Sequence, residues 1–137
     1  MSNLTATNYR ASATGFLPQL YSPEIIETLA PAGTTASSTK GSATNVSFAT
    51  AAAAGTLTFT PAVTPPVGAI KEFYNTAAFQ ATITPGTNVA LISGSGTVIN
   101  TIVLANVVTQ FAKLQYTGLN GSGKLVYRLI SSNGTTT

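Results

Sequence analysis

The side chains of this chain that are best suited to acid–base chemistry are three glutamates and four lysines, and their spacing offers two candidate pairs. Glu24 and Glu27 lie three residues apart, which places two carboxylates side by side if the segment is helical. Ser122 and Lys124 lie two residues apart, which places a nucleophile and a base on one face of a strand. Paired carboxylates suit general acid–base catalysis, and a Ser–Lys pair suits acyl transfer.

Both pairs have a simpler structural explanation. Glu24 and Glu27 fall in a predicted short helix, and negative charges near the N-terminus of a helix stabilise its dipole. Ser122 and Lys124 fall in a predicted loop. The chain has no Cys, His, Asp or Trp, so no imidazole can activate a serine. Divalent metal sites need several carboxylates or imidazoles, which this composition does not supply. We therefore predict that the protein is not an enzyme and that it holds no cofactor or metal.

Two glycine-rich loops and one row of hydroxyls are the other motifs that bear on function. The Gly-Ser-Gly runs at 94–96 and 121–123 share glycines with phosphate-binding loops, but neither opens a predicted helix, so we expect hairpin turns. Thr56, Thr58 and Thr60 place three hydroxyls on one face of a predicted strand, an array that ice-binding proteins repeat many times. The sequence shows one such row, which favours an ordinary solvent-facing strand.

The charge content excludes several classes of partner. Charged residues make up 7% of the chain, against about a quarter in ordinary soluble domains. A surface so poor in charge is expected to be covered by neighbouring subunits. The net charge of +3 comes from six scattered basic residues, whereas binding to nucleic acid needs clustered cations. We therefore expect no nucleic-acid partner. No secretory signal and no membrane span are recognised, so we expect no membrane partner either.

Residues 1–50 are predicted to form an extended N-terminal arm. Ser22 and Pro23 are favourable at a helix start, and the apolar positions that follow predict a short helix near 23–29. The Thr/Ser-rich stretch 34–45 is predicted to be a linker. The arm either packs against another chain or folds back on its own domain. Its predicted partner contacts are apolar and aromatic: Phe16, Leu17, Leu20, Tyr21, Ile25, Ile26 and Leu29.

Residues 51–137 are predicted to form an all-β domain. Apolar and polar residues alternate in short runs that Gly, Pro and Asn separate, as in the run 56–60, where Leu57 and Phe59 share one face. About seven to eight short strands at this spacing predict an antiparallel sandwich or barrel. In the last run, Tyr127 alternates with Leu125 and Leu129, so we expect it in the core.

A series of loose motifs runs through this second half. A strand ends at Pro61, a Pro-Val-Gly step follows at 66–68, and the next strand ends in Phe-Tyr-Asn at 73–75. A Thr-rich strand with a Pro-Gly turn (81–86), a Gly-Ser-Gly loop (94–96) and two closing strands (111–116 and 124–130) complete the series. In these motifs the stretch 56–132 resembles the small β modules of tailed-bacteriophage virion proteins, especially fibres and decoration proteins. Residues 15–29 resemble the opening segment of some phage major capsid proteins.

The two resemblances imply a structural virion protein. The expectation is a capsid decoration (cement) protein on the outer capsid surface, a homo-oligomer with a trimer favoured, whose partner is the major capsid protein. Its arm would tie neighbouring shell subunits together and stabilise the shell. The alternative is a phage fibre or spike module that binds a glycan of the host surface through exposed Tyr and through loops such as 118–123.

Overall fold

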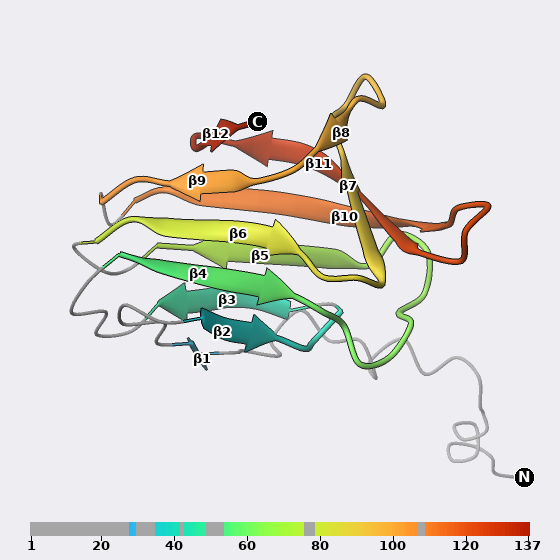
Figure 1. Ribbon diagram of the computed structural model, residues 1–137, viewed down its shortest axis with the longest axis horizontal. Helices are drawn as coiled ribbons and strands as arrows, with labels where there is room; N and C mark the ends of the chain where they lie inside the picture. The colour runs from blue at the N-terminus through green and yellow to red at the C-terminus, as the bar shows by residue number, and fades with distance from the viewer. Residues whose placement is uncertain (1–27, 30–34, 42, 49–53, 76–78, 107–108) are drawn as a thin grey trace, which may run out of the picture.

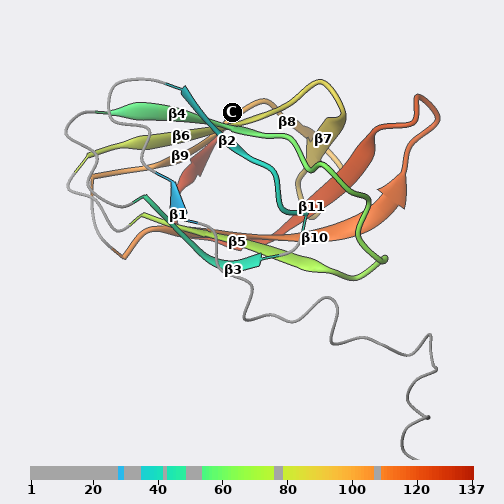
Figure 2. The same ribbon diagram turned by 90° about the horizontal axis from the view of Figure 1, so that it is seen from below.

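The computed structural model describes residues 28–29, 35–41, 43–48, 54–75, 79–106 and 109–137, which form two layers of β-strands (Figure 1, Figure 2). In chain order the strands are β1 (Thr28–Leu29), β2 (Thr35–Ser38), β3 (Ala43–Phe48), β4 (Gly55–Phe59), β5 (Ile70–Tyr74), β6 (Ala81–Pro85), β7 (Val89–Ile92), β8 (Val98–Ile99), β9 (Ile102–Leu104), β10 (Phe111–Leu119), β11 (Leu125–Ser132) and β12 (Thr135–Thr136).

The strands form two mixed sheets in a sandwich-like arrangement. We call sheet A the one with the order β1-β3-β5-β10-β11-β7-β8, and sheet B the one with the order β12-β9-β6-β4-β2. The outermost strands of sheet A, β1 and β8, are two residues long, which leaves five longer strands in that sheet. The predicted all-β class is confirmed.

The predicted antiparallel arrangement is wrong, because both sheets contain parallel pairs. From β1 to β7 the chain changes sheet at every connection, so β1, β3 and β5 become parallel neighbours in sheet A. In the same way β2, β4 and β6 become parallel neighbours in sheet B. A hairpin reverses the direction of the next strand in a sheet, whereas a path through the opposite layer returns the chain in its original direction. The turn at 85–88 is such a connection, since it joins β6 of sheet B to β7 of sheet A.

The predicted linker is also wrong for the residues that the structure describes. Within the stretch 34–45, β2 pairs with β4 over four register positions, and the amide of Thr60 donates to the carbonyl of Ser38 at 2.8 Å. Segments rich in Ser and Thr form strands where a neighbouring strand offers hydrogen bonds to their backbone. Composition does not reveal whether such a neighbouring strand is present. Of the predicted helix 23–29, Thr28–Leu29 form β1, and residues 23–27 lie outside the described part of the chain.

The core lies between the sheets and follows the predicted alternation. Its central rings pack edge to face, with the Phe59 centroid 5.5 Å from Phe73 and 4.8 Å from Tyr127. The Tyr127 hydroxyl donates to the carbonyl oxygen of Gly41 at 2.8 Å, and burial raises the pKa of Tyr127. The expected core position of Tyr127 is thus confirmed. The buried apolar residues are Leu57, Phe59, Phe73, Ala81, Ile83, Val89, Leu91, Ile99, Ile102, Leu104, Ala112, Leu114, Tyr116, Leu125 and Tyr127.

Both Gly-Ser-Gly runs form hairpin turns, as predicted. The first joins the antiparallel pair β7 and β8, and the amide of Gly96 donates to the carbonyl of Ser93 at 3.0 Å. The second joins β10 and β11, and the amide of Gly123 donates to the carbonyl of Asn120 at 2.9 Å. Gly96 and Gly123 have φ angles of 93° and 76°, a left-handed conformation that glycine adopts without strain.

The bend at Gly134 leaves no room for a side chain. A Cβ atom there would lie 2.5 Å from the carbonyl oxygen of Val103 and 2.8 Å from Leu104 Cδ2. We expect Gly134→Ala to lower the free energy of unfolding by about 1–3 kcal/mol, because backbone of β9 must move to admit the methyl group. Gly121→Ala is the matched control, since a Cβ there meets nothing within 4 Å. Urea unfolding measures both, and equal stability of the two variants would contradict the prediction.

Candidate functional site

The strands of the two sheets differ in charge. Among the described residues, the strands of sheet B carry no charged side chain. The strands of sheet A carry Lys71 and Glu72 on β5, Lys113 on β10 and Arg128 on β11. Lys40 and Lys124 lie in the connections between strands. In the described part of the chain, the charged side chains therefore lie on the strands of sheet A or in connections between strands.

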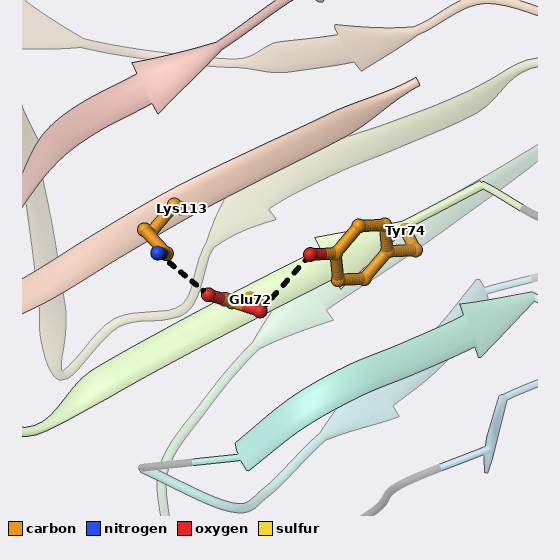
Figure 3. A network of polar contacts seen from close by, with 3 residues as sticks. All are labelled: Glu72, Tyr74 and Lys113. Carbon is orange, nitrogen blue, oxygen red and sulfur yellow. Dashed lines mark hydrogen bonds and ion pairs between the residues drawn. The ribbon is translucent and has the colours of Figure 1, made fainter. Parts of the chain in front are cut away.

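Glu72, Tyr74 and Lys113 form a polar network on the outer face of sheet A (Figure 3). Strands β5 and β10 are antiparallel and place Lys113 directly opposite Glu72. Lys113 Nζ lies 3.0 Å from Glu72 Oε2, and the Tyr74 hydroxyl donates to Glu72 Oε1 at 3.1 Å. One carboxylate of low exposure thus holds two donors that come from two strands.

The network favours fixed protonation states over proton transfer. Partial burial, followed by the hydrogen bond to Glu72, raises the pKa of Tyr74. The hydrogen bond and the negative charge of Glu72 raise the pKa of Lys113. A general base works best with a pKa near the working pH, and both shifts move away from neutrality. At pH 7 Lys113 is charged and Tyr74 is neutral, which makes the network a rigid hydrogen-bonding surface.

Lys71 is a buried cation that sequence reasoning missed. The sequence pattern gives it as one of six scattered basic residues, whereas its side chain is fully buried. Lys71 Nζ donates to the carbonyl oxygen of Lys40 at 2.9 Å and lies 5.3 Å and 5.1 Å from the ring centroids of Phe59 and Phe73. The alternation of side chains along the strand could have indicated this burial, because position 71 shares a strand face with Phe73. A side chain that is fully buried in the core is not accessible to a substrate.

The outer face of sheet B carries a regular array of hydroxyls. In the register of the parallel strands, Thr58 lies opposite both Ser37 and Thr84, and Thr56 lies opposite Thr82. Rows of this kind are about 4.8 Å apart across strands and about 6.6 Å apart along them. Thr56 and Thr58 alternate with buried Leu57 and Phe59, so they point outward. We call this set the hydroxyl face: Ser37, Thr56, Thr58, Thr82 and Thr84.

The hydroxyl face corrects one reading of the sequence. The sequence predicts a single row of hydroxyls at 56–60, but β6 repeats the row at Thr82 and Thr84, and β2 adds exposed Ser37. Position 35 of β2 falls in line with Thr56 and Thr82. Because the three strands are parallel and in register, hydroxyls that are distant in sequence form one uncharged surface.

The remaining candidate residues have mixed outcomes. Ser122 and Lys124 are exposed in the β10–β11 turn, where both backbone amides donate to Asn120 Oδ1, at 2.9 Å and 3.0 Å. Glu24 and Glu27 lie outside the described residues, and so do all the predicted arm contacts except Leu29, which belongs to β1. Over the described ranges, no three His, Cys, Asp or Glu side chains gather as a metal site would need. The same part of the chain contains no helix of the length and hydrophobicity that crossing a membrane requires.

Comparison with protein-family models, with curated proteins and with solved structures found no match for this chain.

Proposed function

We propose that this protein is a structural component of a tailed-phage virion, a decoration protein that binds the outer shell and holds neighbouring subunits of the major capsid protein together. The observation that carries the proposal is the uncharged hydroxyl face, which extends over three parallel strands of sheet B. The phage-like motifs of residues 56–132 support it as well. The role is mechanical, and the partner is a protein surface.

The hydroxyl face suits a permanent protein contact for an energetic reason. Burying a charged group in an interface requires it to lose its hydration, which is costly unless a partner charge replaces the water. A buried hydroxyl loses less hydration free energy than a charged group does. It can form new hydrogen bonds with almost any polar partner, because it both donates and accepts. The threonine methyl groups add apolar contact area. A shell protein can therefore cover this face without matching individual charges.

The arm supplies the second part of the proposed contact. Its aromatic and apolar residues ahead of β1, from Phe16 to Ile26, would lie along the shell and join adjacent subunits. The oligomer, a trimer in this proposal, would set the spacing between arms. Buried apolar area contributes about 25 cal/mol per Å², offset by the ordering of the arm. Removing residues 1–27, which spares β1, is expected to weaken binding to empty shells.

The copy number of this protein per virion tests the proposal against its alternative. Quantitative mass spectrometry of purified particles should give a number comparable to that of the major shell protein. A count of a few copies per vertex or tail would contradict the decoration role. It would favour instead the fibre or spike module that binds a host glycan.

Charge placed on the hydroxyl face is expected to prevent binding to the shell. The double variant Thr58→Lys/Thr84→Lys puts two ammonium groups on neighbouring positions of β4 and β6. We expect it to bind empty shells at least about tenfold more weakly, because both groups must be desolvated. Co-sedimentation with shells measures the binding. Ser131→Lys, at an exposed position of β11 in sheet A, is the control and should bind as the unmodified protein does.

Unchanged binding by the double variant would show that sheet B does not face the shell. Far-UV circular dichroism of both variants checks that the fold is kept, so that a loss of binding is not mistaken for unfolding.

A further inference from the structure

Two aromatic rings lie next to the polar network on the outer face of sheet A. Tyr74 of β5 and Phe111 of β10 are directly opposite each other in the antiparallel register. Their ring centroids are 6.1 Å apart and their planes differ by 31°. Both side chains are half-buried, so each ring keeps part of its surface open to solvent. The pair thus presents two neighbouring, roughly aligned apolar surfaces.

The polar network holds this pair in place. Figure 3 shows the phenol of Tyr74 lying along β5 with its hydroxyl toward Glu72, and Lys113 approaching the same carboxylate from β10. The bond from Tyr74 to Glu72 restricts the rotation of the ring, and the ion pair restricts the carboxylate. A surface ordered before binding loses less side-chain entropy when a ligand arrives.

Glu72 and Lys113 still have hydrogen-bonding capacity for a ligand. A carboxylate offers about four lone-pair sites, and on Glu72 the donors of Tyr74 and Lys113 use two of them. The Lys113 ammonium has three N–H groups, and its side chain is 40% exposed. The acceptors of Glu72 and the donors of Lys113 therefore lie beside the apolar surface of the two rings, and the charges of Glu72 and Lys113 cancel.

We propose that Tyr74, Phe111, Glu72 and Lys113 form a saccharide-binding platform. A hexose ring has an apolar face of C–H groups that packs on aromatic rings, and a rim of hydroxyls that both donate and accept. A carboxylate beside an ammonium matches such a rim. The balanced charge favours neutral sugars over phosphates, and nucleic acid would require clustered cations. The platform lies on sheet A and does not depend on the proposed contact of sheet B with a shell.

The test is saturation-transfer difference NMR on the isolated full-length protein. The probes are the methyl glycosides of glucose, galactose, mannose, rhamnose and N-acetylglucosamine at millimolar concentration. We expect transfer to at least one of them, strongest at the C–H protons of a single sugar face. No transfer from the unmodified protein to any of the five would overturn the proposal.

Variants locate the binding surface. Tyr74→Leu and Phe111→Leu keep apolar volume but remove a ring, and each should weaken binding by about tenfold or more. Phe79→Leu is the matched control, because Phe79 is 40% exposed and lies ahead of β6, and it should bind normally. Tyr74→Phe keeps the ring and loses the hydrogen bond to Glu72, so we expect an intermediate loss of sugar binding. This variant still tests the platform if a leucine variant fails to fold. Equal binding by the Phe111→Leu and Phe79→Leu variants would contradict the assignment.

Because the glycosides are tested on the isolated protein, loss of glycan binding and loss of shell binding are separate results. A protein that binds sugars but no shell would refute the decoration role and leave the platform intact. A protein that binds shells but no sugar would do the reverse.

Discussion

Replacing Phe59 with alanine is expected to lower the free energy of unfolding by about 3–5 kcal/mol. Phe59 is fully buried at the end of β4 and touches the core from several sides. Its ring packs edge to face against Phe73 and Tyr127, and Lys71 Nζ lies over it. Alanine would remove all three contacts and leave a cavity that the two sheets cannot close, because β4 is held by strands on both sides. Urea unfolding followed by circular dichroism measures the change.

Val63→Ala is the control for this prediction, since Val63 lies in the β4–β5 connection and is 71% exposed. Its effect should stay within about 0.5 kcal/mol, as for most surface substitutions. If Phe59→Ala proved as mild as Val63→Ala, the core between the sheets would not be packed as described.

The alternation of side chains could be predicted from the sequence because it depends on neighbours in the chain. Leu57, Phe59 and Tyr127 were placed inside correctly, and the β10–β11 turn was found from its glycines. These features follow from the two-residue period of a strand and from the freedom of glycine at positive φ, which act over a few residues.

The pairing of the strands could not be predicted, because it depends on residues that are distant in the chain. Whether β7 turns back beside β6 or crosses to the other sheet is decided by which apolar faces meet, and the turn sequence at 85–88 does not decide it. The hydroxyl face has the same origin, since Ser37, Thr58 and Thr84 meet only through the parallel register. Strand β2 was missed because its Ser- and Thr-rich sequence lacks an apolar period.

Lys71 was also missed, although its position on the core face of β5 could be read from the alternation with Phe73. Lysine side chains are almost always exposed in proteins, so a surface position is the expectation for Lys71 in spite of the alternation. The structure shows what permits the exception. The carbonyl of Lys40 accepts a hydrogen bond from the ammonium, and two phenyl rings offer their negative faces to it. These three contacts all favour a positive charge.

Reversing that charge should therefore be among the most damaging single changes. In Lys71→Glu, a carboxylate would face the Lys40 carbonyl oxygen and the faces of Phe59 and Phe73, all of which repel it. We expect a loss of roughly 3–5 kcal/mol at pH 8, typical of an uncompensated buried charge. Burial would raise the pKa of this carboxyl above its unfolded value of about 4.3. The loss should therefore shrink as the pH falls toward 4 and the group becomes neutral. Lys71→Met, which keeps most of the volume and cannot titrate, is the comparison. Similar stability of the two variants at pH 8, measured by urea unfolding, would contradict the expected repulsion of a carboxylate at position 71.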